Sequence, residues 1–243
     1  MDKLIFTAVS GASRNLARQQ IHANNLANVN TAGFRRDLET ANSQLLTAAG
    51  YASRQLVNTA TSAVDTSPAA LRETGRDLDI AIKGEGLIAL AANDREVYTR
   101  NGQITLGPEG DLSINGYPVI GDNGPIILPP FSALHISDDG VISLVAEDGN
   151  MAAPLDVDRI KLVSIPGADL SKNEAGFLVT AAQENPRDED IVVASRHLES
   201  ANVSVMDEML SSIALNRQFE AQIKMMKAAE ELANAGNRLL RGA

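Results

Sequence analysis

Both ends of the chain are long stretches without proline whose apolar residues recur at helical spacing, and this feature constrains the fold most strongly. From residue 2 to residue 30 the only glycine is Gly11. The positions that repeat at alternating intervals of four and three are Ile5, Val9, Ala12, Leu16, Gln19, Ala23 and Leu26. This is the heptad spacing of helices that pack along a shared seam. We therefore predict a long N-terminal helix.

The same spacing also occurs in an ordinary amphipathic helix that lies on its own domain. The seam composition favours a bundle instead, because Ala12, Gln19 and Ala23 are small or polar. Such residues suit the close approach of helices in a crowded bundle.

The first helix is expected to end between residues 28 and 33. Asn28 and Asn30 tolerate the left-handed backbone conformation, and Gly33 adopts it freely. We expect Gly33 to set the direction in which the chain leaves the helix, and Phe34 to pack at that corner as an apolar anchor.

A second helix is predicted at the C-terminal end, where residues 202–240 contain no proline. Its stripe comprises Met206, Leu210 and Ile213, then, after a small phase slip, Phe219, Ile223, Met226, Ala229, Ala233 and Leu240. A continuous helix would span roughly 55–60 Å at about 1.5 Å per residue, more than a compact domain of this size needs. We expect it to find partners outside its own fold, and we read Asn202 as its N-cap.

The middle of the chain has a different pattern, with short and often alternating apolar runs between residues 78 and 180. Turn clusters such as Asn115-Gly116 and Asp138-Asp139-Gly140 separate these runs, which is typical of β-hairpins. The predicted fold class is α+β. Residues 1–40 and 198–243 supply helices packed together as a coiled-coil-like domain, residues 41–76 form an extended or irregular linker, and residues 77–197 form an all-β domain.

Composition excludes several function classes. Aromatic residues make up 3% of the chain and tryptophan is absent, so stacked rings for sugars or single-stranded nucleic acid are scarce. The net charge of −10 repels nucleic acid and anionic lipid. Arg35-Arg36 is the one adjacent basic pair, and we interpret it as a solvated helix end. Neither a signal peptide nor a run of about 18 apolar residues is present, so direct membrane insertion is not expected.

No catalytic, cofactor-binding or metal-binding residues are predicted, and we expect the protein not to be an enzyme. Phosphate-loop, nucleophile-elbow and zinc-helix motifs are absent. The histidines His22, His135 and His197 are best interpreted as ordinary polar residues. The acidic turns lack the regular ligand spacing of a calcium loop.

Residues 25–34 (NLANVNTAGF) resemble the motif that ends the N-terminal helix in the axial proteins of the bacterial flagellum, which are the rod, hook and hook-associated proteins. Residues 198–203 (LESANV) and 217–220 (RQFE), with Met206 and Met209, resemble the closing helix of the same family. Residues 78–82, 98–102 and 116–126 are similar to the rod proteins. The first interpretation is a protein of the proximal rod, and the alternative is a protein of the distal rod or another hook-type axial protein.

The resemblance implies a subunit that polymerises helically into the drive shaft between basal ring and hook. It implies export without a cleavable signal through the flagellar type III apparatus, assembly in the periplasm, and partners among further copies and the rod proteins FlgB, FlgC, FlgG and FliE. The expected subunit-packing residues are Ile5, Val9, Ala12, Leu16, Ala23, Leu26, Asn28, Gly33, Phe34, Met206, Leu210, Ile213, Phe219, Ile223, Met226 and Leu240.

Two other classes remain open at this point. A β-rich carbohydrate-active or adhesive domain would need a cleft with paired carboxylates or an aromatic floor. An intracellular coiled-coil scaffold would not depend on flagellar export.

Overall fold

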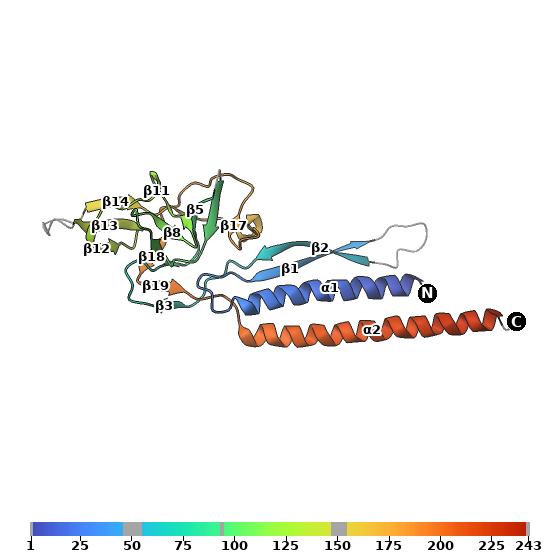
Figure 1. Ribbon diagram of the computed structural model, residues 1–243. Coiled ribbons are helices and arrows are strands. Elements are labelled where there is room, and N and C mark those ends of the chain that lie inside the picture. The colour runs from blue at the N-terminus through green and yellow to red at the C-terminus, as the bar shows by residue number, and fades with distance from the viewer. Residues whose placement is uncertain (1, 46–54, 93–94, 147–154, 242–243) are drawn as a thin grey trace. The chain divides into compact units, whose positions relative to one another are not determined.

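The computed structural model describes residues 2–45, 55–92, 95–146 and 155–241, with side chains for all of these except residues 2–5, 39–45, 55–62 and 239–241 (Figure 1). The chain divides into two compact units. The helical unit comprises Met1–Ala27, Glu39–Thr61 and Val203–Ala243, and the β unit comprises Asn28–Leu38 and Ser62–Asn202.

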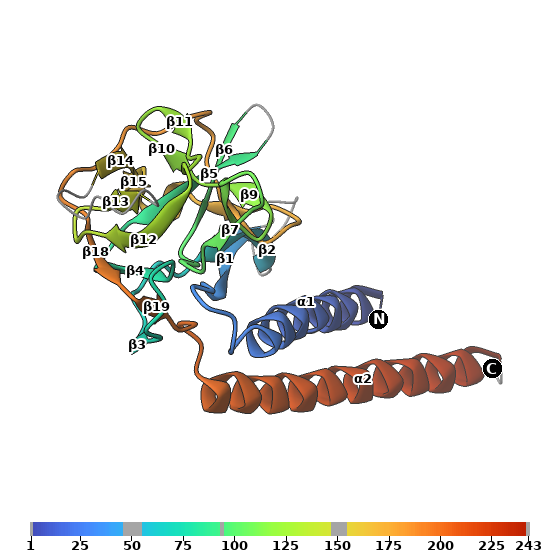
Figure 2. The same ribbon diagram turned by 60° about the vertical axis from the view of Figure 1, so that its left-hand side comes forward.

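The helical unit contains two long helices, α1 (Asp2–Ala27) and α2 (Val205–Arg241). They lie side by side and antiparallel, and the C-terminal end of α2 extends beyond the start of α1 (Figures 1 and 2). α2 is unbroken over 37 residues, about 55 Å at 1.5 Å per residue. Two terminal helices and a large β region confirm the predicted α+β class.

The segment 41–76, for which we expected an extended linker or irregular wrap, contains regular strands in its described residues. It holds most of strand β1 (Asp37–Leu45), strand β2 (Gln55–Val64) and the short strand β3 (Leu71–Glu73), and β1 and β2 form a two-stranded sheet. Valine and threonine in β2 favour extended backbone. The sequence lacks the alternation of apolar and polar residues by which strands are recognised, so it carries no signal of period two.

The predicted helix break is confirmed, and the predicted cap is wrong. α1 ends at Ala27, and Gly33 adopts a left-handed φ of 68°. α2 begins at Val205, and Ser204 Oγ accepts a hydrogen bond from the Asp207 amide at 3.4 Å. Ser204 rather than Asn202 is therefore the N-cap, because it directly precedes the helix.

The β unit is a set of small antiparallel sheets. The largest has the strand order β15-β5-β6-β17-β16, and the others pair β12-β13-β14, β7-β8-β9, β10-β11, β18-β4 and β19-β3. The bounds are β4 (Ile80–Lys83), β5 (Leu87–Ala92), β6 (Arg95–Thr99), β7 (Thr105–Leu106), β8 (Leu112–Ile114), β9 (Tyr117–Pro118), β10 (Ile120–Gly121), β11 (Gly124–Pro125), β12 (Phe131–Ile136), β13 (Val141–Ala146), β14 (Leu155–Arg159), β15 (Leu162–Val163), β16 (Ser171–Lys172), β17 (Leu178–Val179), β18 (Val192–Ser195) and β19 (His197–Glu199), with a 3-10 turn at Gly167–Asp169.

The core of the β unit is aliphatic, with Ile80, Ile88 and Leu90 fully buried. Asn115 and Gly116 both have positive φ and join β8 to β9, which confirms the Asn-Gly hairpin turn expected from the sequence. None of the helices in the described part of the chain is long and apolar enough to cross a membrane.

Candidate functional site

The segment that follows α1 and the segment that precedes α2 meet within the β unit, at a place that we call the junction. We define it by Gly33, Arg35, Arg100, Glu199 and Asn202. The Gly33 amide donates to the Glu199 carbonyl at 2.8 Å, and the Asn202 amide donates to the Phe34 carbonyl at 3.2 Å. The Arg36 amide donates to Asn202 Oδ1 at 2.7 Å. Two segments far apart in the sequence are thus tied together, largely through the backbone.

A buried ion cluster forms the centre of the junction. Arg35 Nη2 and Arg100 Nε each lie 2.7 Å from an oxygen of Glu199, and the three side chains are 2%, 2% and 0% exposed. The Ala69 amide donates to the same carboxylate at 2.7 Å. Burial lowers the pKa of Arg100, and its bond to Glu199 opposes this shift. Removal of the carboxylate would leave two buried cations without their counter-ion.

The interpretation of Arg35-Arg36 as a solvated helix end is wrong. Arg35 is buried against Glu199, which lies 164 residues away in the sequence, so no local pattern reveals the pair. Arg36 is half-buried, and its Nε donates to Asp65 at 2.8 Å. Burial raises the pKa of Asp65, but hydrogen bonds from Ser67 and Arg36 outweigh it and hold that pKa below its ordinary value.

Gly33 sits where no side chain fits. A Cβ built on it would lie 2.2 Å from the Arg100 carbonyl carbon and from the Asn101 amide nitrogen. Phe34 is half-buried, and the Lys172 ammonium lies 4.1 Å from the centre of its ring. After the predicted break, Gly33 therefore makes a close backbone contact with Arg100, and Phe34 makes a cation–π contact with Lys172.

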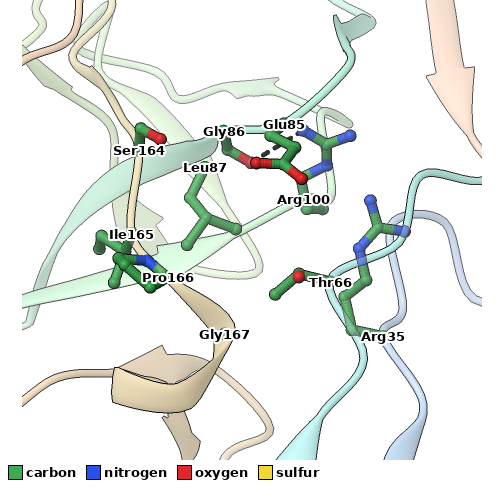
Figure 3. Close-up of a pocket in the computed structure, with 10 residues that line it drawn as sticks. All are labelled: Arg35, Thr66, Glu85, Gly86, Leu87, Arg100, Ser164, Ile165, Pro166 and Gly167. Atoms are coloured by element: carbon green, nitrogen blue, oxygen red, sulfur yellow. Dashed lines mark hydrogen bonds between the residues drawn. The ribbon is translucent and has the colours of Figure 1, made fainter.

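A cavity of about 310 Å³ borders this cluster (Figure 3). Its lining residues are Arg35, Thr66, Glu85, Gly86, Leu87, Arg100, Ser164, Ile165, Pro166 and Gly167. Arg100 Nη1 and Nη2 donate to the carbonyls of Gly86 at 2.8 Å and Gly84 at 2.7 Å. Arg100 is held through all three of its guanidinium nitrogens, and Arg35 is held through Nη2, so the cluster acts as a brace. Among the described residues, Arg35 Nη1 is buried without a hydrogen-bond partner. The described residues contain no group of three or more side chains that could hold a metal ion.

The helical unit brings α1 and α2 together through small and polar side chains. Ala8, Ala12 and Asn15 are buried on α1, and Leu215 and Ala229 are buried on α2. The Gly11 backbone lies so close to Gln222 that a Cβ there would be 2.6 Å from Gln222 Nε2. Small side chains thus accompany a close helix approach at Ala8, Gly11 and Ala12.

Many of the expected packing residues lie away from this contact. Val9 and Leu16 are 49% and 47% exposed on α1, and Met206, Leu210 and Ile213 are 75%, 63% and 48% exposed on α2. Ala23 is also exposed, and Leu26, Asn28, Phe219, Ile223 and Met226 are half-buried. The side chains of Ile5 and Leu240 lie outside the described residues.

The phase slip in α2 coincides with a change of surroundings. Met206, Leu210 and Ile213 lie on the side of α2 opposite Glu208 and Leu215, because about 3.6 residues make one turn. After the slip, Phe219, Ile223 and Met226 are partly covered.

Sequence reasoning missed the residues that carry the α1–α2 contact and the junction. The missed residues are Ala8, Asn15, His22, Asn25, Arg35, Arg100, Glu199, Glu208 and Leu215. Two signals were present. Asn25, Arg100 and Glu199 lie within the motifs that resemble the flagellar axial proteins, and Glu208, Leu215, Gln222 and Ala229 recur every seven residues. Half of the latter four residues are polar, so they do not form an apolar stripe.

Comparison with known proteins places this geometry in context. The model "Flagella basal body rod protein" matches residues 5–35, and the model "Flagellar basal body rod FlgEFG protein C-terminal" matches residues 194–239. The chain is 38% identical to the flagellar basal-body rod protein FlgF of Salmonella typhimurium and 36% identical to that of Escherichia coli K12, over 99% of each chain. It is 28% identical to the rod protein FlgG of Bacillus subtilis, over 96% of this chain and 97% of that one.

Proposed function

The chain belongs to the flagellar basal-body rod proteins and is a structural subunit of the rod, not an enzyme, and from this premise we propose that it builds the proximal part of the rod. The observation that carries the proposal is the match to FlgF proteins over 99% of the chain. The lower identity to FlgG favours the proximal over the distal rod.

The terminal helices form the inner, coiled-coil-like layer of the rod, and the β unit belongs to its outer layer. The support is the exposed apolar stripe of α2, formed by Met206, Leu210 and Ile213, and that of α1, formed by Phe6, Val9 and Leu16. Full burial of one such side chain contributes about 1.5–3 kcal/mol. Other copies of this chain or other rod subunits cover these stripes, and the resulting tube transmits torque.

The two helices fold fully only on incorporation into the rod. Among the described side chains of the helical unit, the nearly fully buried apolar ones are Ala8, Ala12, Leu215 and Ala229. Their burial cannot offset the ordering of 26 residues in α1 at about 1–2 kcal/mol of backbone entropy each. Circular dichroism of the purified chain should therefore show far less helix than the structure. Full helix content with strong exchange protection at both ends would refute this part of the proposal.

The junction holds the two segments that lead to α1 and α2, so that torque passes between layers through a fixed point. The Gly33 contact and the Glu199 ion cluster support this role. We further propose that the chain leaves the cytoplasm unfolded through the flagellar export apparatus and meets FlgB, FlgC, FlgG and FliE in the periplasm.

Complementation of a deletion strain tests the proposal. The strain should not swim, and its basal bodies should lack a completed rod. A variant with Met206→Ser, Leu210→Ser and Ile213→Ser should accumulate in cells at the normal level and fail to restore swimming. The matched control is Lys224→Ser with Lys227→Ser, two exposed positions of the same helix, which should restore it. Complete rods in the deletion strain would overturn the rod role, and complete rods with the stripe variant would overturn the packing role of α2.

A further inference from the structure

Polar side chains bridge α1 and α2, and we call this set the polar ladder. It consists of Asn15, Gln19, His22 and Asn25 of α1 with Glu208, Asn216 and Gln222 of α2. The Asn15 amide donates to Gln222 Oε1 at 3.3 Å, and the Gln19 amide donates to Asn216 Oδ1 at 3.0 Å. Two of the bridges are thus amide-to-amide contacts between the helices.

Glu208 is the most heavily used member of the ladder. It is 4% exposed, His22 Nδ1 lies 2.5 Å from its Oε2, and the Asn25 amide donates to its Oε1 at 3.4 Å. Both carboxylate oxygens therefore have partners on α1. A buried carboxylate is costly without such partners.

This arrangement reverses the ordinary amphipathic pattern, in which the apolar face of each helix is covered by its neighbour. Here Asn15, Asn25 and Glu208 are nine-tenths or more buried, whereas Phe6 and Met206 are 64% and 75% exposed. Stability alone would favour the opposite arrangement. Buried polar residues in helix pairs are best known for setting register and partner choice.

The spacing along α2 adds register information. Its contact positions alternate as Glu208, Leu215, Gln222 and Ala229, with seven residues between each pair. A slip by one heptad would place Leu215 against His22 and Asn25, where Glu208 now lies. That slip would remove the carboxylate partner from a buried amide and an imidazole, a loss that a uniformly apolar seam would not suffer.

We propose that the polar ladder fixes the register of α1 on α2, so that the chain selects its own helix pair over slipped pairs and over pairs with the helices of neighbouring subunits. This inference rests on the proposed function, since the terminal helices pair and pack within the assembled rod. The exposed apolar stripes favour association of the helices but do not specify a register, and the polar ladder specifies that register.

Thiol crosslinking in isolated basal bodies measures the register, because the chain contains no cysteine. The native reporter carries Gln19→Cys and Asn216→Cys, whose parent side chains are hydrogen-bonded. The slip reporter carries Gln19→Cys and Ile223→Cys, one heptad further along α2. A short bismaleimide distinguishes them, since seven residues displace the helix by about 10 Å.

Each reporter is combined with two ladder variants. The smoothed variant replaces Asn15, His22, Asn25, Glu208 and Gln222 by Leu, and the matched control exchanges one pair as His22→Glu with Glu208→His. The parent and the exchanged chain should crosslink in the native reporter. The smoothed chain should show a native-to-slip ratio lower by about tenfold, the ratio that 1.4 kcal/mol of lost discrimination gives.

The outcomes separate this inference from the rod assignment. Absence of the parent chain from basal bodies would overturn the proposed function. Incorporation of the smoothed chain with an unchanged native-to-slip ratio would overturn the register inference and leave the rod role intact. The smoothed chain could also fail to enter basal bodies while the exchanged chain enters normally. This result would support the inference, because loss of the polar ladder alone would then prevent correct assembly.

Discussion

Substitution of Gly33 by Ala should destabilise the β unit far more than the same substitution at Gly75. Both glycines have a left-handed φ, 68° and 76°, so both variants incur the backbone cost of about 1–2 kcal/mol for a side chain in that region. They differ in surroundings. A Cβ at Gly33 would lie 2.2 Å from the backbone of Arg100, whereas a Cβ at Gly75 meets nothing within 4 Å.

The additional loss at Gly33 follows from overpacking, which costs about 1–3 kcal/mol where the neighbour must move. The neighbour here is backbone, and the movement would also strain the 2.8 Å bond from Gly33 to Glu199. We therefore expect a total loss of about 2–5 kcal/mol for Gly33→Ala and about 1–2 kcal/mol for Gly75→Ala.

Urea unfolding of the purified chain measures the difference. Tyrosine fluorescence reports mainly on the β unit, since the chain has no tryptophan and two of its three tyrosines, Tyr98 and Tyr117, lie in that unit. Gly33→Ala should lower the midpoint clearly more than Gly75→Ala, with similar slopes. Equal midpoints for the two variants would refute the argument that the Arg100 backbone excludes a side chain at position 33.

Three further predictions concern the β unit. Glu199→Gln leaves Arg35 and Arg100 without their counter-ion and should destabilise by about 3–5 kcal/mol, measured by the same urea titration, and a loss below that of Gly75→Ala would contradict the brace. Burial raises the pKa of Tyr98 to about 12. The folded chain therefore holds this proton more tightly than the unfolded chain, and stability should fall as pH rises from about 10 towards 12. Tyr98→Phe should weaken this pH dependence, and an unchanged alkaline denaturation curve for that variant would contradict the reasoning. Asn202→Ala removes the bonds to Arg36 and Asp65 and should lower the urea midpoint of the β unit, whereas Ser204→Ala, at the α2 cap, should leave that midpoint unchanged.

Local sequence signals predicted the features that depend on neighbouring residues. The end of α1 followed from asparagines and Gly33, and the β8–β9 turn followed from Asn115-Gly116, because both depend on backbone conformations that few residues adopt. The α+β class followed from the change of periodicity along the chain.

Features that depend on distant partners were not predictable in this way. Glu199 meets Arg35 and Arg100 across 164 and 99 residues, and a carboxylate in sequence looks the same whether buried or solvated. Apolar spacing identified the stripe of Val9 and Leu16 but not the surface that covers it. Within its own chain, α1 contacts α2 through Asn15 and His22 instead.

The bond between Gly33 and Glu199 closes the intervening chain into a loop whose two ends are fixed at one point. The segment between these two ends can therefore be exchanged or altered in evolution as one block. Insertions or deletions in hairpins of the β unit change the contents of the loop without moving its ends, so the sequences of α1 and α2 need not change with them. Lineages of such subunits can therefore vary the size of this part of the protein while keeping the same pair of helices.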